Sequence, residues 1–435
     1  MNFKLYNFSR LFKASYFNAV IVFVKVICGL VISKTVAVFM GPSGLALLGN
    51  LKSFTETAIS FTSVGYQNGT IRYISEFSKD KSQQNRITTT VLQLSLCFSL
   101  IIGVLLWFFS NYWSLVLFKS LDYTYVPKLL AFGLPFLSFN LITIYILNGL
   151  EKFKKLVVIN SVLNITQMIV VVYLVINFNL KGGLIGTIIG PVFVFLINIM
   201  TLGNDRGLLF NLFKVSFFSL KVVKNMSAYF FMAIYSSAIV SINVLLIRNL
   251  IIEKLNVQEA GYWEAMNRIS SFYIMFFISL TSFYLLPRLS KTNNFKLFIE
   301  ELKNFYVLCI PLLLIVFSSI YFLRFFLLKL LLNEEFLPTS NLFFWKLIGD
   351  FISVLAIALV KQFHAKRMVK AYIVSNGVLN LLYFGLSYFL IDIYGLEGIV
   401  KSYAISYLIY LILVIIFIVS FFKKKIRLDT FNIMF

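Results

Sequence analysis

Long apolar runs constrain this 435-residue chain more than any other feature of its sequence. A helix needs about 20 mostly apolar residues to cross the roughly 30 Å of hydrocarbon in a bilayer. Runs of this kind lie at residues 14–40, 45–74, 87–110, 124–150, 156–178, 184–202, 227–251, 261–287, 305–331, 339–362, 372–391 and 396–422. They lack the alternation of barrel strands, and only helices or closed barrels satisfy their backbone groups in lipid. The sequence therefore predicts an all-α polytopic membrane protein with about 12 transmembrane helices.

The charge of the chain is strongly basic, with 39 Lys and Arg against 17 Asp and Glu. A nucleic acid partner is one explanation for such an excess. However, the basic residues gather in every second connection, as at Lys152–Lys155 and Lys423–Lys425. Cytoplasmic loops of membrane proteins carry this bias, and anionic lipid headgroups balance it. We therefore expect both termini in the cytoplasm, a lipid bilayer as partner and no nucleic acid.

An internal repeat divides the chain into halves. A shift of 216 residues places Lys154, Asn160, Leu163, Asn164 and Gly182 on Lys370, Asn376, Leu379, Asn380 and Gly398. Because both halves begin on the same side, this pattern favours two parallel six-helix bundles around a central cavity. The predicted domains are an N-terminal bundle (1–202), an amphipathic cytoplasmic linker helix (203–224) and a C-terminal bundle (225–435).

Charged residues inside the spans are the candidate functional groups, because each costs about 2.5–3.5 kcal/mol at mid-bilayer. Opposite charges four residues apart share a helix face in Lys52–Glu56, Glu264–Arg268 and Lys346–Asp350. Local neutralisation explains any one of these pairs equally well. Taken together, cations exceed carboxylates, which predicts a positive cavity for an anion such as a phosphate or an acidic sugar. The candidates are the cations Lys25, Lys34, Lys52, Arg248 and Arg268 and the cavity carboxylates Glu56, Glu264 and Asp350.

Motifs of soluble enzymes do not occur in the sequence. It contains no P-loop, no dinucleotide fingerprint and no metal-ligand spacing, and its single histidine, His364, lies in or beside a basic loop. We therefore expect no catalytic residue, no metal, no cofactor and no enzymatic activity. Cations near span ends, including Lys128 and Arg324, are expected to reach towards the membrane surface.

The first two spans carry a resemblance to a known family. The stretch Lys25–Lys34, the turn Gly41-Pro42-Ser43-Gly44 and the segments Asn50–Phe54 and Gly65–Tyr73 resemble the opening of the Wzx-type flippases. The likeness is strong over residues 14–80 and architectural beyond them. The family's motif includes the first-span lysines and the turn, which fall here on Lys25, Lys34 and Gly41–Gly44.

The resemblance implies membership of the multidrug/oligosaccharidyl-lipid/polysaccharide (MOP) superfamily, whose members form two six-helix bundles around a central cavity. It implies alternating-access translocation of undecaprenyl-diphosphate-linked oligosaccharide from the cytoplasmic to the periplasmic leaflet of the bacterial inner membrane. The product would serve O-antigen or enterobacterial common antigen synthesis, with the branch that handles lipid III most similar. A polysaccharide polymerase and a chain-length regulator would act with such a flippase, which we expect to be a monomer.

Two other functions stay open at this point. An ion-coupled multidrug exporter of the same superfamily would need a net anionic site for cationic drugs, whereas the intramembrane charges here are net positive. A membrane-embedded glycan polymerase or ligase would need catalytic Arg and His residues in a large outer loop, and the outer connections of this chain are short. The sequence does not identify the sugars or a coupled ion.

Overall fold

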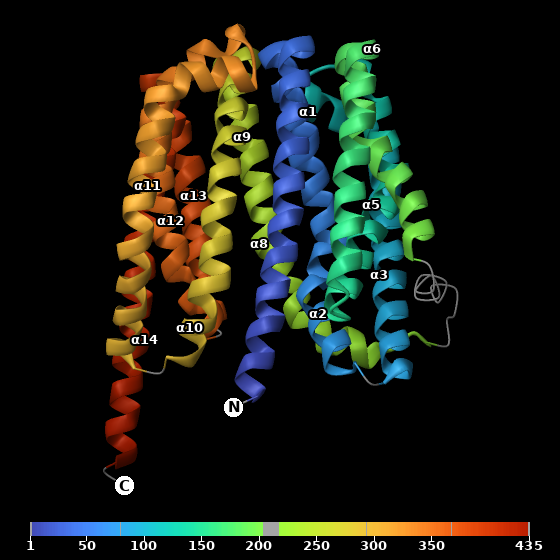
Figure 1. The fold of residues 1–435 in the computed structure, drawn as a ribbon. Coiled ribbons are helices and arrows are strands. Elements are labelled where there is room, and N and C mark those ends of the chain that lie inside the picture. The colour runs from blue at the N-terminus through green and yellow to red at the C-terminus, as the bar shows by residue number, and fades with distance from the viewer. Residues whose placement is uncertain (1, 79, 203–216, 293, 367, 434–435) are drawn as a thin grey trace. The chain divides into compact units, whose positions relative to one another are not determined.

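Helices make up almost all of the described chain, and no strand occurs in it. The computed structural model describes residues 2–78, 80–202, 217–292, 294–366 and 368–433 (Figure 1). The elements of the first part are α1 (Asn2–Thr62), η1 (Val64–Tyr66), α2 (Gln67–Glu76), α3 (Lys81–Phe108), α4 (Ser110–Phe118), η2 (Leu121–Tyr123), α5 (Tyr125–Gly149) and α6 (Phe153–Leu202). Those that follow are α8 (Leu220–Lys254), α9 (Val257–Leu280), η6 (Thr281–Leu285), α10 (Leu286–Lys291), α11 (Phe295–Leu331), η7 (Glu334–Leu342), α12 (Phe343–Ala365), α13 (Val369–Tyr394) and α14 (Leu396–Ile433).

The apolar spans of the sequence appear as long helices. Nine helical segments of the described chain are long and apolar enough to cross a bilayer. Two of them, in α1 and α6, each hold two predicted spans, because a single non-helical residue interrupts each helix: Gly41 in α1 and Asn179 in α6. The helix α9 covers most of a further predicted span, 261–287. Because of its polar residues, α9 is not one of the nine apolar segments. The prediction of an all-α polytopic protein is confirmed, with helices that accommodate about 12 spans.

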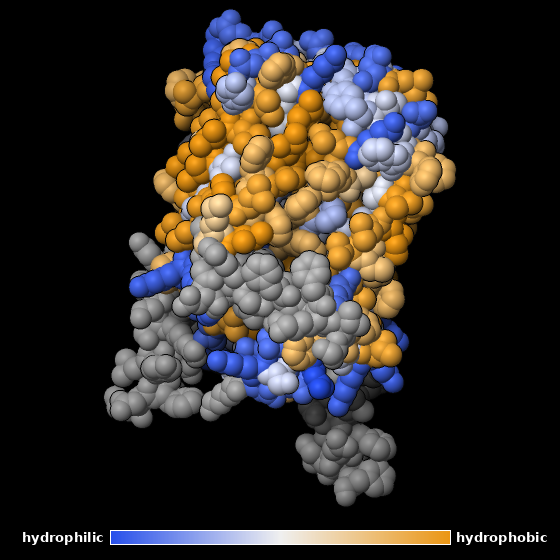
Figure 2. All heavy atoms as spheres, turned by 90° about the vertical axis from the view of Figure 1, so that its right-hand side faces the viewer, coloured by the Kyte–Doolittle hydropathy of each residue, from blue (hydrophilic) through white to orange (hydrophobic). Residues whose placement is uncertain are grey.

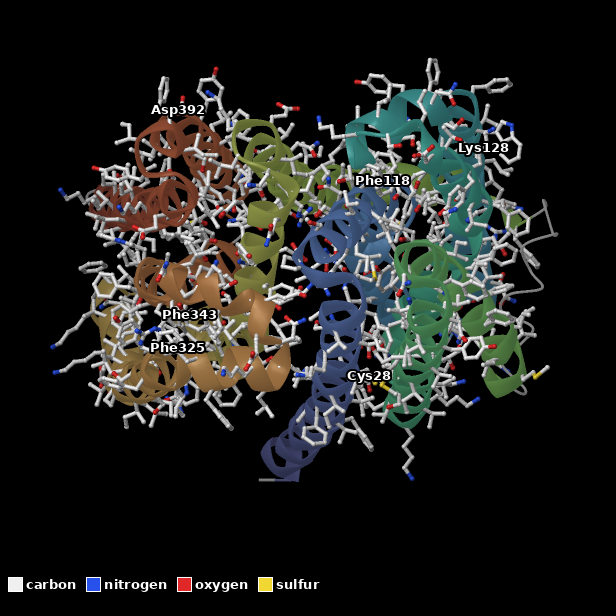
Figure 3. The ribbon with its side chains drawn as sticks, turned by 90° about the horizontal axis from the view of Figure 1, so that it is seen from above. Cys28, Phe118, Lys128, Phe325, Phe343 and Asp392 are labelled. Atoms are coloured by element: carbon white, nitrogen blue, oxygen red, sulfur yellow. The ribbon has the colours of Figure 1, made fainter. Side chains whose placement is uncertain are left out.

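The chain separates into two compact units, Met1–Leu245 and Leu246–Phe435, which meet within α8. In the N-terminal unit α1 packs along α6, with the buried Cys28 at this contact, and α5 packs against both α3 and α6 (Figure 3). In the C-terminal unit α14 packs against α12 and α13. The predicted boundaries of the two bundles stay predictions. Residues 203–216 of the predicted linker helix lie outside the described residues.

The predicted internal repeat is confirmed at the glycine that begins the last span of each half. Asn179 and Gly395, which are 216 residues apart, share one unusual backbone conformation (φ 49°, ψ −130° and φ 56°, ψ −139°). Three residues later, Gly182 and Gly398 each lie against a backbone carbonyl of the preceding helical arm, and no Cβ atom fits there. Both turns are therefore built the same way, and glycine is required where the two arms approach.

The same offset relates the hydrogen bonds of four span asparagines. Their side-chain amides donate to the carbonyl four residues earlier, at 2.7–3.1 Å, in Asn160–Leu156, Asn164–Asn160, Asn376–Tyr372 and Asn380–Asn376. Each bond satisfies a polar side chain within its own helix, which apolar surroundings require. The repeat in the sequence thus corresponds to a repeat of local structure.

One face of the N-terminal unit carries a broad apolar surface between hydrophilic ends. Figure 2 shows this hydrophobic band on the face that contains α3, α5 and α6. On α3 it includes the exposed side chains of Leu100, Ile101, Val104, Leu105 and Phe108. An apolar patch of this size is unusual in a soluble monomer and is the surface that lipid covers in a membrane protein.

Candidate functional site

The chain reverses at Gly41, within α1, and this reversal assembles the first charged group. Gly41 has φ 61° and ψ −168°, which L side chains rarely adopt, and Pro42 follows it. Lys25 interacts electrostatically with Lys52 and Glu56. In a straight helix Lys25 and Glu56 would lie about 46 Å apart, so the two arms of α1 run back along each other. The predicted turn at Gly41–Gly44 is therefore present.

Lys25, Lys52 and Glu56 form an open group with one net positive charge. The Lys52 ammonium lies 4.0 Å from a Glu56 carboxylate oxygen, and 63% and 52% of the two side chains are exposed. The Lys25 side chain is exposed as well, on the first arm of the same helix. Open ion pairs are worth only about 0–1 kcal/mol, so an incoming anion displaces Glu56 from Lys52 at little cost.

Lys34 does not join this group. It follows Lys25 by nine residues, which places it about 180° around the same helical arm. It is half-buried beside the buried Ser33, Val36 and Ala37, and it has an interaction partner within the protein. Lys34 thus lies on the packed side of α1.

In the C-terminal unit one carboxylate holds two arginines. Glu264 on α9 accepts a hydrogen bond from Arg248 on α8 at 2.5 Å and another from Arg268 at 2.9 Å. Arg248 is 2% exposed and lies 5.4 Å from the centre of the Trp263 ring, whereas 15% of the Arg268 side chain is exposed. The predicted Glu264–Arg268 pair is confirmed. The partner of Arg248 comes from a neighbouring helix, which spacing along one helix does not show.

The second buried carboxylate, Asp350 on α12, is fully enclosed. One of its oxygens accepts hydrogen bonds from the hydroxyls of Ser270 (2.6 Å) and Tyr273 (2.5 Å), and the other accepts one from Tyr403 (2.9 Å). The Lys346 ammonium lies 3.4 Å away and 3.7 Å from the centre of the Tyr403 ring. Asp350 is 0% exposed, so these groups replace water around it.

The predicted site residues differ in how far their side chains are exposed. The three predicted pairs all form, as Lys52–Glu56, Glu264–Arg268 and Lys346–Asp350. Only the first is open, since the other two are buried within the C-terminal unit. Sequence reasoning missed the hydroxyl partners of Asp350, for which the one signal is the presence of serine and tyrosine inside apolar spans.

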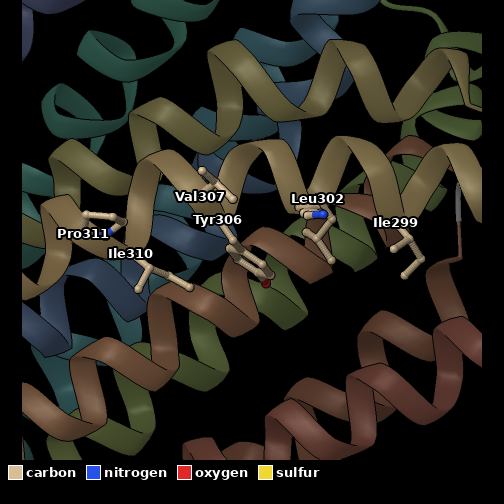
Figure 4. A pocket seen from close by; sticks show the side chains of 7 residues that line it. Ile299, Leu302, Tyr306, Val307, Ile310 and Pro311 are labelled. Carbon is tan, nitrogen blue, oxygen red and sulfur yellow. The ribbon is translucent and has the colours of Figure 1, made fainter.

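Lys128 and a groove along α11 lie in mostly apolar or aromatic surroundings. Lys128 lies at the margin of its unit, 5.7 Å from the centre of the Trp107 ring, as a residue at the membrane surface would (Figure 3). A groove of about 550 Å³ along α11 is lined by apolar residues together with Lys303 and Tyr306 (Figure 4). No group of three or more His, Cys, Asp or Glu side chains in the described residues could hold a metal ion.

Solved structures identify the class of this fold. An inward-facing multidrug resistance MATE family transporter of the MOP superfamily superposes with a TM-score of 0.80 at 14% identity, over 92% of this chain and 96% of that one. The inward closed lipid II flippase MurJ superposes with a TM-score of 0.72 at 16% identity, over 93% and 87% of the two chains. The chain therefore has the fold of MOP superfamily transporters, as predicted.

Two curated proteins are similar to this chain over nearly their whole length. The lipid III flippases of Escherichia coli (strain K12) and of Shigella flexneri are each 24% identical to it over 402 residues, which cover 92% of this chain and 95% of each relative. No family model matches the chain. The sequence likeness thus extends well beyond the first two spans.

Proposed function

We propose that this protein is a flippase, which moves a lipid-linked oligosaccharide with an undecaprenyl diphosphate anchor from the cytoplasmic to the periplasmic leaflet of a bacterial inner membrane. The observation that carries the proposal is the open cationic group of Lys25 and Lys52, which Glu56 neutralises only in part. A diphosphate is the anion that such a group suits, because each ammonium donates charge-assisted hydrogen bonds to phosphate oxygens. The similarity to two lipid III flippases, whose names state that activity, supports the same substrate class.

The charged residues have different roles in the proposed transport. Lys25 and Lys52 bind the diphosphate, and Glu56 neutralises Lys52 when the substrate is absent. Arg268, which keeps part of its surface exposed, is a further candidate for binding an anion. Arg248 positions Glu264, because breaking a buried ion pair costs about 3–5 kcal/mol. Lys34 supports the hairpin from its packed side, while Asp350 fixes α12 to α9 and α14.

Transport would follow alternating access. The fold neighbours include MATE transporters solved in inward-facing and outward-facing conformations. In the proposed cycle the headgroup enters from the cytoplasm, where both termini lie, while the polyprenyl tail stays in lipid. Movement of the two units then exposes the headgroup to the periplasm. A polymerase and a chain-length regulator would act on the released product, and no chemical bond changes within the flippase itself.

A multidrug exporter is the second candidate, because MATE transporters share the fold. Its cationic substrates would need an accessible negative site. Of the carboxylates singled out in the spans, Glu264 and Asp350 are buried on basic partners, and Glu56 faces two lysines. The charges therefore favour an anionic substrate.

One reconstitution separates the two candidates. The purified chain is placed in proteoliposomes that contain undecaprenyl-diphosphate-linked oligosaccharide, and access of an impermeant glycosidase to the sugar is followed over time. The flippase proposal expects the protected half of the sugar to become accessible, and it expects no ethidium accumulation under a proton or sodium gradient. Ethidium accumulation without sugar exposure would establish the exporter instead.

A further inference from the structure

The basic side chains of the C-terminal unit differ in how they are paired. Seven of them lie within 4.0 Å of a carboxylate, namely Arg248, Lys254, Arg268, Arg288, Lys329, Lys346 and Lys401. Lys361 on α12 is half-buried, and no carboxylate of the described residues lies within that distance of it. A cation in an apolar helix without a counter-charge is costly, so it is a candidate for binding an anion.

The Lys361 ammonium has one hydrogen-bond partner among the described residues. It donates to the Ser282 hydroxyl at 2.9 Å, and that hydroxyl donates in turn to the Ile278 carbonyl at 3.0 Å. An ammonium carries three N–H donors, so two of them remain for a ligand. Ser282 belongs to η6, a single π-helical turn at the end of α9, and such turns are frequent at functional sites.

A second polar group beside Lys361 has no partner in the described chain. Gln362 is 0% exposed, and neither its amide nitrogen nor its amide oxygen has a hydrogen-bond partner. Buried amides almost always have partners, so this one points to a group that the protein itself does not supply.

Gln362 follows Lys361 directly on α12, in the last turns of the helix, which lie beside η6 and α10. Lys361 bonds to Ser282 on η6, and Lys366 bonds to the Ser290 carbonyl on α10 at 3.2 Å. Viewed down α12, Gln362 lies about 100° around from Lys361, and Lys366 caps the end of the helix. The η6–α10 segment therefore runs along the end of α12, and Gln362 lies between the two lysines in the sequence.

We propose that Lys361, with Ser282 and Gln362 beside it, forms a phosphate-binding contact of the C-terminal unit. The inference rests on the proposed function, because the phosphates it assigns are those of the lipid-linked substrate. Two ammonium donors and an amide donor match the oxygens of a phosphate group, while Ser282 holds the ammonium in place. Lys361 lies about 22 Å along α12 from the buried Lys346, near the end of the unit that also carries Arg288, Lys291 and Lys366. The headgroup would meet this contact at the basic end, before the deeper residues.

Binding of undecaprenyl diphosphate to the detergent-purified full chain tests the contact. K361Q is expected to raise the Kd by about tenfold or more, as for the loss of a hydrogen bond to a charged group. K361R should retain most of the affinity. K366Q removes the same charge five residues away and should bind as wild type does. Q362L should weaken binding while the free protein becomes no less heat-stable, because an unsatisfied buried amide is replaced by an apolar side chain.

Binding of phosphatidylglycerol shows whether the contact recognises the diphosphate of the substrate or the phosphate of an ordinary membrane lipid. The proposal expects K361Q to leave the affinity for this lipid unchanged. Equal losses for both lipids, or wild-type binding of undecaprenyl diphosphate by K361Q, would overturn the assignment. If wild type itself did not bind undecaprenyl diphosphate, the proposed function would fail, which is a different result from failure of Lys361 alone.

Discussion

Replacing Glu264 by glutamine should destabilise the protein severely, because one carboxylate compensates two arginines. Arg248 is 2% exposed and bonded to Glu264 at 2.5 Å, so water cannot replace the lost charge. Leaving one member of a buried ion pair without its partner costs about 3–5 kcal/mol. For a domain of 150–250 residues each kcal/mol shifts the melting temperature by about 2–4 °C, so E264Q should lower it by about 6–20 °C.

Thermal unfolding in detergent, followed by intrinsic fluorescence, measures this shift. The matched control is E56Q, which makes the same chemical change in an open pair whose side chains are more than half exposed. That change should cost no more than about 1 kcal/mol. A double variant, R248M/E264Q, should recover much of the loss, because an apolar side chain replaces the uncompensated charge. Equal melting temperatures for E264Q and E56Q would refute the buried-pair reasoning.

Two further variants test the packing that holds the candidate site. D350N replaces one acceptor oxygen by an NH2 donor, so at least one of the three hydroxyls loses its acceptor, and Lys346 loses its counter-charge. We expect a loss of about 3–5 kcal/mol, and an unchanged melting temperature would contradict the enclosed pair. G182A places a Cβ atom against a backbone carbonyl of the preceding arm of α6 and should lower the yield of folded protein, whereas G385A, which meets open space, should not. Size-exclusion chromatography of the two glycine variants checks this difference, and equal yields would show that the close approach is unimportant.

Periodic and composition-level features of this protein could be predicted from its sequence. Apolar run length predicted the helical spans, since lipid leaves the backbone few alternatives. The spacing of four residues predicted the pairs formed by Glu56, Glu264 and Asp350, because a helix fixes which side chains share a face. The 216-residue offset predicted an internal repeat, and Gly182 and Gly398 show one physical reason for it: a Cβ atom is excluded at both places.

Contacts between helices could not be predicted in the same way. Arg248 and Glu264 lie on different helices, so no regular spacing connects them. The same limit applies to the serine and two tyrosines around Asp350, and to Lys361, whose partner Ser282 lies on another helical segment. Which cations are open and which are enclosed depends on packing, and a sequence pattern does not contain that information.

The central claim is that the open lysines of the first hairpin bind an anionic headgroup. The most direct test is the flipping rate of undecaprenyl-diphosphate-linked oligosaccharide in proteoliposomes that contain K25Q/K52Q, compared with wild type and with K128Q. The account predicts a loss of at least about tenfold for K25Q/K52Q, with equal amounts of folded protein, and an unchanged rate for K128Q. A wild-type rate for K25Q/K52Q would contradict it.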